Sequence, residues 1–422
     1  MSADVLFARG QMAYSLAFHI VFAAVGIAMP LLMVIAELAW RRTGAPEYLA
    51  LAKRWARGTA VFFAIGAVSG TALSFELGLL FPTFMKHAGA LVGLPFSLEG
   101  FAFFTEAIFL GVYLYGRDRV PAWAHVGSGI VVAVSGALSA AFVTLVNAWM
   151  NAPRGFTVAD GKLVDLDPIA AMASPFALHE IVHNVLAAYL AITLAVAAIH
   201  AWQLLKGRSP DFHRRALAIA LAVTIPAAIA QPIVGHHAGQ VVAKHQPMKL
   251  AAIEGLEHTQ ARAPLHVGPI AIPGLLSWMA FGDADAVVQG LEEVPPADRP
   301  PWIVRPAFQI MVALGSAAAV YALFSAIWWA RRRRLPDARW WLWATVVLGP
   351  TGLIATEAGW TVTEVGRQPW TITGFLRTAD AVTPVGGLWL PFVGFAAIYV
   401  GLAIVCTVIL IRQVRAAEEQ KP

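Results

Sequence analysis

Nine stretches of this chain are apolar over a length that can cross a membrane as an α-helix. About 20 residues are enough, because a helix rises about 1.5 Å per residue through roughly 30 Å of hydrocarbon. The stretches cover residues 14–40, 55–82, 96–116, 124–148, 179–205, 213–235, 306–330, 340–360 and 387–411. Since backbone polar groups in lipid must be satisfied within each segment, the pattern predicts an all-α bundle of about nine transmembrane helices.

The composition agrees with an integral membrane protein and excludes a soluble globular domain. Of the 422 residues, 59% are hydrophobic and only 13% are charged. The single cysteine, Cys406, excludes a disulfide framework and a cysteine-held cluster within the chain. We expect no cleaved signal peptide, because the first apolar run is too long for one. The net charge of +5 requires no nucleic-acid partner, since the basic residues follow membrane topology.

The basic residues predict an orientation. With the N-terminus outside, the inner connections hold most of the 30 Lys and Arg residues, including the run Arg331–Arg334. An odd number of spans then places the C-terminus inside. We interpret the arginine run as a stop signal at the lipid headgroups, and a specific partner site is the alternative.

The spans predict a single transmembrane domain, residues 1–422, with one long connection. This connection, residues 236–305, lies between the sixth and seventh spans and is rich in proline and charge. A connection of that length in a compact protein is usually functional or disordered. We expect it to form an outer ligand-binding loop.

Chemically costly side chains fall near one level of the predicted bundle. Odd-numbered spans run inward and even-numbered spans run outward, so residues early in odd spans share a level with residues after the eighth span. They are His19, Glu99, His183, Met311 and Glu364. Nothing in an apolar bundle favours such a common level, whereas a redox site built from several helices requires it.

Span 96–116 carries two carboxylic acids, Glu99 and Glu106. They are close to two helical turns apart, so both point the same way and Glu106 lies about 10 Å deeper. We interpret Glu99 as a haem-linked acid and Glu106 as a deeper proton-relay acid, because ionisable residues inside a span indicate function. The alternative is a pair of acids that hydrogen-bond between helices.

Three residues are candidate axial ligands of haem iron: His19, His183 and Met311. A His and a Met on facing helices can hold a low-spin haem, and a haem with one strong protein ligand keeps a position open for O₂. Singly, each residue is also compatible with hydrogen bonding or packing in a core. His179, one turn before His183, is a rival ligand or a supporting residue.

The long connection begins with a segment that predicts a helical turn carrying Lys249 and Glu254. Quinol must lose two protons with its two electrons, so a carboxylate acceptor and a cation that orients the ring oxygens fit its oxidation. The alternative is a salt bridge on the surface of the loop.

The end of the eighth span, from Gly359 to Trp370, is rich in groups suited to a porphyrin. Glu364 and Arg367 can pair at i, i+3 if the helix continues. Arg367 can also bind a haem propionate, and Trp360 can pack on the macrocycle. Tryptophans at a membrane interface are common, so they add little alone.

Together these residues resemble subunit I of the cytochrome bd-type quinol oxidases, over essentially the whole chain. The matching residues are Arg9 with His19, Glu99-Gly100, Phe103-Phe104-Thr105-Glu106, Asn147-Ala148-Trp149-Met150, His183, Lys249-Leu250-Ala251-Ala252-Ile253-Glu254, Met311 and Gly366-Arg367-Gln368-Pro369-Trp370. The last motif, together with Glu364, is the most specific.

The resemblance implies the haem ligands. His183 and Met311 would be the axial ligands of the low-spin haem that takes electrons from quinol. His19 would bind the iron of one high-spin haem. Glu364 or Glu99 would serve at the other, and which high-spin haem each residue serves stays open.

The resemblance also implies roles for the remaining residues. Glu106 would lie on the proton route to the O₂ site, Lys249 and Glu254 would serve quinol oxidation, and Arg367 would neighbour a haem. The cofactors would be haem b558, haem b595 and haem d or a further haem b. The substrates would be O₂ and ubiquinol or another quinol.

The implied protein is a terminal oxidase of the bacterial cytoplasmic membrane. Its N-terminus and quinol loop would be periplasmic and its C-terminus cytoplasmic. Quinol oxidation outside and O₂ reduction to water with protons from inside would contribute to the proton gradient without pumping. The expected partners are subunit II, a small single-helix accessory subunit and membrane lipid.

Two features of the sequence depart from the common pattern of this family, one residue and one loop length. Many members have an arginine two residues before the Met ligand, where this chain has Gln309. The loop after Glu254 is short, as in the branch that includes the cyanide-insensitive oxidases, in which a haem b can replace haem d.

Three other classes of membrane protein fit less well. A proton-coupled transporter that uses Glu99 and Glu106 predicts internal sequence symmetry, which is not visible. A di-haem dehydrogenase anchor requires more histidines at a suitable depth. A haem-copper oxidase requires further histidines beside His236 and His237.

Overall fold

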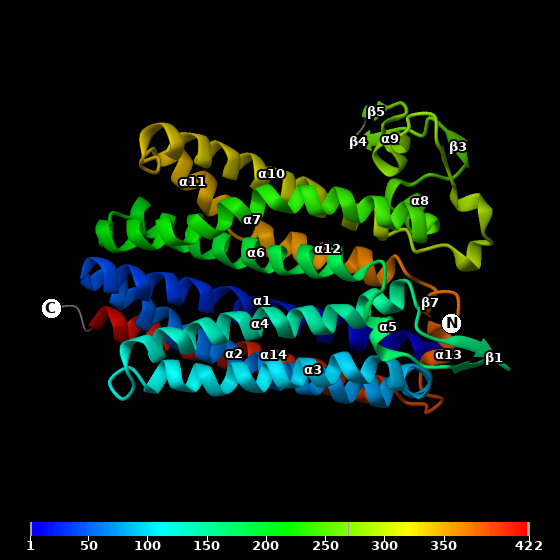
Figure 1. Ribbon diagram of the computed structural model, residues 1–422, viewed down its shortest axis with the longest axis horizontal. Coiled ribbons are helices and arrows are strands. Elements are labelled where there is room, and N and C mark those ends of the chain that lie inside the picture. The colour runs from blue at the N-terminus through cyan, green and yellow to red at the C-terminus, as the bar shows by residue number, and fades with distance from the viewer. Residues whose placement is uncertain (1, 269, 420–422) are drawn as a thin grey trace.

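The computed structural model describes residues 2–268 and 270–419 as a bundle of long helices that lie side by side (Figure 1). In these residues, eight helices are long and apolar enough to cross a membrane. They are α1 (Ala3–Thr43), α2 (Pro46–Leu80), α3 (Pro82–Tyr115), α4 (Ala122–Asn151), α6 (Ala177–Leu205), α7 (Pro210–His245), α10 (Val304–Arg332) and α14 (Trp389–Glu419). The expected all-α membrane bundle is therefore confirmed.

The eighth expected span, 340–360, is divided into two helices. They are α11 (Arg339–Leu348) and α12 (Thr351–Val365). The break falls at Gly349 and Pro350, because proline has no N–H to donate and its ring clashes with the preceding turn. A Cβ at Gly352 would collide with Ala191 of α6, so the small residues also let this broken span approach α6 closely.

The described spans divide into two packed groups. The first contains α1, α2, α3 and α4, and the second contains α6, α7, α10 and the α11–α12 pair. Each has an apolar interior, with Leu32 and Met33 buried in the first and Leu194, Leu221 and Trp341 in the second. Helices α1 and α4 also pack against α6, and α14 lies against α1 and α2. Residues of the two groups can therefore meet between α1, α4 and α6.

Short elements gather at one end of the bundle, on the right in Figure 1, together with the N-terminus. They are α5 (Pro168–Met172), α8 (Pro247–Glu254), α9 (Leu275–Phe281), α13 (Thr378–Ala381), η1 (Leu291–Glu293), η2 (Pro296–Asp298) and the antiparallel pairs β1 (Thr157–Ala159) with β2 (Lys162–Val164), β3 (Gln260–Ala261) with β6 (Val287–Val288), β4 (Leu265–Val267) with β5 (Ile270–Ile272), and β7 (Trp370–Ile372) with β8 (Leu376–Arg377). The C-terminal end of the chain lies at the other end of the bundle. We call the end with the short elements the capped end.

The sixth span is longer than expected. Helix α7 continues through Pro232 to His245, so the connection between α7 and α10 covers residues 246–303 rather than 236–305. Lys249 and Glu254 then lie on the short helix α8, where a helical turn was expected. The extension places both residues at the capped end, beside the end of α12.

Candidate functional site

His183 lies on α6 and faces α7. A Cβ at Gly235 would lie 3.3 Å from Cε1 of His183, so the glycine leaves room for the imidazole. Gln231 donates from Nε2 to the carbonyl oxygen of His183 at 3.1 Å. The Nδ1 atom of the ring is buried and has no hydrogen-bond partner among the residues that the structure describes. Because buried polar atoms are normally paired, this ring fits a ligand better than it fits packing alone.

Met311 lies on α10 and faces α12 in the same group of helices. Its Sδ atom would lie 3.0 Å from a Cβ at Gly359, which is tighter than ordinary contact. Trp360 follows this glycine and is half-buried. Helix α6 packs on α12, and α7 packs on α10, so His183 and Met311 both lie in the second group of helices. Imidazole and thioether from facing helices are a known pair of haem ligands.

His19 on α1 is held by α2. Its Nδ1 lies 2.9 Å from Oγ of Ser69, and that hydroxyl donates to the carbonyl oxygen of Gly66 at 3.1 Å. Since the hydroxyl proton is used, Nδ1 is the donor and Nε2 carries the lone pair. A Cβ at Gly70 would lie 2.9 Å from Cε1 of His19, so glycine is required beside the ring. The tautomer is the one that binds a metal through Nε2.

Glu99 and Glu106 lie on the side of α3 that faces α4. Ser139 of α4 donates to Oε1 of Glu99 at 3.1 Å. The Glu106 carboxylate is wedged between two glycines, with Oε1 3.4 Å from a Cβ at Gly26 and Oε2 3.4 Å from a Cβ at Gly136. Glu106 is buried and Glu99 is half-buried. The two acids therefore follow one helix face into the first group of helices.

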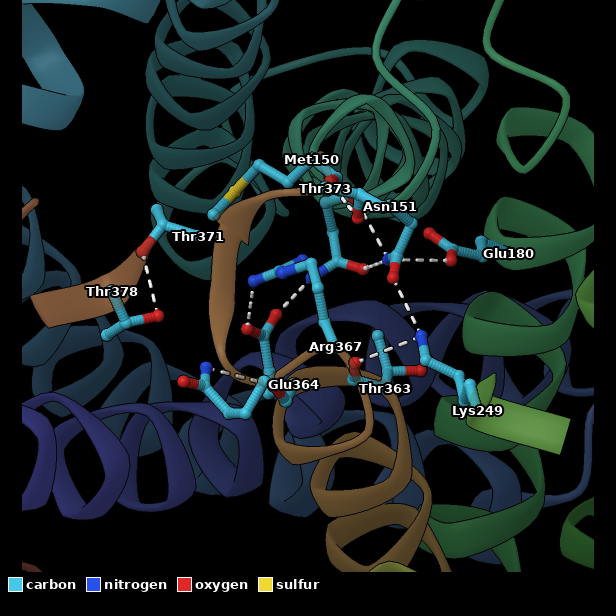
Figure 2. Close-up of polar contacts among 12 residues, drawn as sticks. Met150, Asn151, Glu180, Lys249, Thr363, Glu364, Arg367, Thr371, Thr373 and Thr378 are labelled. Atoms are coloured by element: carbon cyan, nitrogen blue, oxygen red, sulfur yellow. Dashed lines mark hydrogen bonds and ion pairs between the residues drawn. The ribbon is translucent and has the colours of Figure 1, made fainter. Parts of the chain in front are cut away.

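Glu364 and Arg367 form a polar cluster at the end of α12 (Figure 2). Arg367 donates from Nη2 to Oε2 of Glu364 at 2.5 Å, and Asn147 of α4 donates from Nδ2 to Oε1 of the same carboxylate. The expected i, i+3 pair is therefore formed. Arg367 is 4% exposed, yet its Nε and Nη1 atoms have no partner in the described part of the chain. A buried guanidinium with free N–H groups fits an anionic ligand such as a carboxylate.

Lys249 on α8 reaches into the same cluster. Its Nζ donates to Oδ1 of Asn151 at 2.7 Å and to the carbonyl oxygen of Thr363 at 3.3 Å (Figure 2). Burial, with Arg367 nearby, lowers the pKa of Lys249 below its ordinary value. The alternative, a salt bridge of Lys249 on the surface of the loop, is not found among the described residues, and the ammonium points into the bundle.

Glu254 ends α8 and is also buried. Burial raises the pKa of Glu254 to about 7, although the charge of Arg305 works in the opposite direction. Gly255 follows with a left-handed φ of 68°, which ends the helix and brings the chain close to Arg305. A carboxyl group with this pKa can exchange a proton near neutral pH.

Sequence reasoning missed two members of the cluster, Asn151 and Glu180. Asn151 donates from Nδ2 to Oδ1 of Asn147 at 2.8 Å and to Oε1 of Glu180 at 3.2 Å. Glu180 is an acid early in a span, and the same feature makes Glu99 a candidate in the sequence. Asn151 gave no comparable signal, because a polar residue at the end of a span is ordinary.

His179 remains an alternative to His183. It is 4% exposed, and its ring lies 6.0 Å from that of His237 on α7. Its Nδ1 has no partner within residues 2–268 and 270–419. Both histidines lie on the side of α6 that faces α7. The structure therefore places two imidazoles, and not one, at this level of the second group.

The residues of the site fit a metal ion that is already coordinated by a prosthetic group. Among residues 2–268 and 270–419, no three His, Cys, Asp or Glu side chains converge as a metal-binding group. A haem is flat and carries carboxylates, so it needs single ligands on separate helices, space beside them and a cation for its propionates. The structure offers glycines beside His19, His183 and Met311. It also offers the N–H groups of Arg367 that have no partner in the described residues. The donor set therefore fits haem.

The fold and this donor set define a helical membrane protein built to hold redox cofactors between its spans. A family model described as "Cytochrome bd terminal oxidase subunit I" matches residues 7–418. The chain therefore belongs to the family of cytochrome bd oxidase subunit I. The resemblance found in the sequence is confirmed.

Individual relatives and a solved structure agree with this assignment. The chain is 34% identical to a protein of Bacillus subtilis (strain 168) named as a putative cytochrome bd menaquinol oxidase subunit I, over 95% of each chain. It is 26% identical to the cytochrome bd-II ubiquinol oxidase subunit 1 of Escherichia coli (strain K12), over 88% of each chain. The bd oxidase structure from Geobacillus thermodenitrificans matches with a TM-score of 0.89 and 37% identity, over 98% of each chain. This is a multi-pass bacterial membrane oxidoreductase of a haem-dependent quinol oxidase family that works with a second subunit.

Proposed function

We propose that this chain oxidises quinol at the capped end of the bundle and reduces O₂ to water with bound haems. The observation that carries the proposal is the arrangement of His183 and Met311. Both present iron-binding atoms within one group of helices, and each faces a glycine that leaves room beside it. When bound, haem b558 there, and haem b595 with haem d or a further haem b elsewhere, would supply electron transfer and O₂ reduction.

His19 would hold one high-spin haem through Nε2, because Ser69 occupies its other ring nitrogen. Glu364 or Glu99 would serve at the second high-spin haem. Within the described residues, Nε and Nη1 of Arg367 have no partner and suit a haem propionate, and the half-buried Trp360 would pack on a porphyrin face.

Lys249 and Glu254 would handle the quinol. The Lys249 ammonium would donate to a ring oxygen and orient the substrate. Glu254, whose pKa burial raises to about 7, would accept a proton as the quinol loses its electrons. The substrate is ubiquinol or another quinol, and relatives of this chain are named for menaquinol and for ubiquinol.

Glu106 would pass protons toward the O₂ site from the end of the bundle opposite α8. Its carboxylate is buried between two glycines, and Glu99 lies two turns nearer the capped end with Ser139 as a hydrogen-bond donor. Protons from quinol would leave at the capped end, and protons for water would arrive from the other end. That separation would contribute to a proton gradient without a pump.

The proposed orientation follows the basic residues of the sequence. The N-terminus and the 246–303 connection would be periplasmic, and the C-terminus would be cytoplasmic. Subunit II would complete the enzyme, with a small single-helix subunit as a further partner.

The direct test is the reduced-minus-oxidised absorption spectrum of the purified complex. We expect one low-spin and two high-spin haem signals, together with quinol-dependent O₂ consumption. Colourless protein from cells that make haem would contradict the proposal and would favour a transporter instead.

A further inference from the structure

The proposed quinol site, on which this inference rests, contains a buried cation without a directly bound acid. In the described part of the chain, the hydrogen bonds of Lys249 Nζ go to two neutral oxygens, of Asn151 and Thr363. Lys249 is only 4% exposed. A buried ammonium is strongly destabilised unless an opposite charge lies near it.

That opposite charge is one amide group away. The Asn151 side chain accepts from Lys249 through Oδ1 and donates through Nδ2 to Oε1 of Glu180 (Figure 2). Its dipole is therefore aligned between a cation and a carboxylate. We infer that Glu180, acting through Asn151, is a positioning residue that holds the Lys249 ammonium in place for quinol.

The charge balance of the cluster supports this role. The cluster contains two bases, Lys249 and Arg367, and two acids, Glu180 and Glu364. Arg367 already binds Glu364 at 2.5 Å. Without the Glu180 carboxylate, two buried cations would share one acid, and the Lys249 ammonium would be driven toward water.

The packing of α8 shows that the lysine is built into this position. Gln246, just before α8, donates from Nε2 to the carbonyl oxygen of Asn151 at 2.9 Å. A Cβ at Gly366 would lie 3.1 Å from both Cγ and Cε of Lys249, so the glycine leaves space for the aliphatic part of the lysine side chain. Helix α8 is thus fixed to the ends of α4 and α12 with Asn151 at the junction.

Glu180 also links this site to the helix of the proposed electron acceptor. It lies three residues before His183 on α6, which is close to one helical turn. Its Oε2 atom is buried and has no partner among the described residues, so the hydrogen bond from Asn151 to Oε1 leaves the other carboxylate oxygen available. Through Asn151, the quinol-facing lysine is therefore connected to the helix that carries His183.

The test is a double-mutant cycle in the complete oxidase complex with subunit II. The variants are Glu180→Gln, Lys249→Gln and the pair, and oxidation of a short-chain quinol gives kcat and KM. We expect each single variant to raise KM by about tenfold, with kcat changed less than about twofold, because the substrate is misoriented but the electron path is intact. The double variant should be no worse than the single ones, since both act on one interaction.

Two further measurements, one conservative variant and one control variant separate positioning from a structural role. Haem spectra and O₂ consumption by the chemically reduced complex should match the wild type in all variants. Glu180→Asp, which keeps the charge, should recover part of the KM. Asp337→Asn, which removes an exposed carboxylate at the opposite end of the bundle, is the charge-matched control and should behave as the wild type.

The outcomes are distinguishable. A wild-type KM in Glu180→Gln with a raised KM in Lys249→Gln overturns this inference alone, as would additive effects in the double variant. Loss of haem in both Glu180→Gln and Glu180→Asp also overturns it, because Glu180 would then be structural. An unchanged KM in Lys249→Gln contradicts the proposed quinol site itself, and the inference falls with it.

Discussion

The two ends of the bundle each bury a carboxylate among bases, but they complete its bonding differently. At the end opposite α8, Glu37 is fully buried and binds Arg41 at 2.6 Å and His125 at 2.9 and 3.0 Å. The second ring nitrogen of His125 lies 2.9 Å from the carbonyl oxygen of Tyr113. Both carboxylate oxygens and both imidazole nitrogens therefore have partners within the chain. Arg117 also reaches this carboxylate, with Nη2 3.5 Å from Oε2, and its Nη1 is buried without a partner in the described residues.

The capped end leaves more of its polar atoms unpaired. Within residues 2–268 and 270–419, Oε2 of Glu180, Nε and Nη1 of Arg367, and Nδ1 of both His179 and His183 are buried without partners. Natural proteins pair nearly all such atoms, because an unpaired buried polar group is costly. A closed cluster joins helices, whereas an open cluster is suited to a ligand that completes it. Single substitutions test this difference.

The largest effect is expected from removing a proposed haem ligand. His183→Ala should abolish the low-spin haem band and lower quinol oxidase activity by about 100-fold or more, because the iron loses an axial ligand. The spectrum of the purified complex measures this directly. His258→Ala, at an exposed histidine of the 246–303 connection, should keep all haem bands. An unchanged low-spin band in His183→Ala would refute the assignment and favour His179.

A substitution in the Glu37 cluster should lower the stability of the protein and leave its haem content unchanged. Glu37→Gln should destabilise the protein by roughly 3 kcal/mol, because it leaves buried basic groups without their counter-charge. Thermal unfolding of the complex measures the change, while haem spectra at low temperature should match the wild type. Loss of haem with an unchanged unfolding midpoint would reverse the comparison between the two ends.

Glu106 lies between the two ends and tests the proton route. Glu106→Gln should slow O₂ reduction by about 10- to 100-fold while all haems stay bound, because the amide cannot carry a proton. Stopped-flow reaction of the reduced complex with O₂ gives the rate. If a haem is lost instead, Glu106 is structural.

Glu254 should give quinol oxidation a dependence on pH. Its pKa is raised to about 7, so the carboxyl group is protonated below that pH and ionised above it. Only the ionised form accepts a proton, so kcat/KM for quinol should rise several-fold as pH increases through about 7. In Glu254→Gln this rise should disappear. A wild-type pH profile in that variant would exclude Glu254 as the acceptor.

The smallest effect is expected from filling the space beside Met311. The Cβ in Gly359→Ala would lie 3.0 Å from Sδ of Met311, so the thioether must shift by a few tenths of an ångström. We expect a small shift of the low-spin band with the haem retained. Gly315→Ala is the matched control on α10, because a Cβ there meets open space. Identical spectra for the two variants would mean that Met311 is not a ligand.

The positions of the spans follow from hydrophobic length alone. A run such as 124–148 has one way to satisfy its backbone in lipid, so the sequence was sufficient to predict helix α4. The break at Pro350 and the continuation of α7 past Pro232 were not predictable in the same way. Whether proline ends, kinks or merely interrupts a helix depends on which neighbours satisfy the freed groups.

The candidate ligands could be named from the chain because ionisable and sulfur-bearing residues stand out in an apolar span. His19, Glu99, His183 and Met311 were found for that reason, and the family resemblance strengthened the choice. Their glycine partners, such as Gly70 and Gly235, carry no such signal, because closeness between helices is set by packing.

The sequence by itself determined the class of fold, the family and the residue types available for redox chemistry, since these depend on composition, length and local motif. Only the tertiary structure decided that Lys249 points inward, that Asn151 stands between it and Glu180, and which polar atoms are left without partners. Those facts depend on helices α4, α6, α8 and α12 meeting at one end, and no local pattern encodes that meeting.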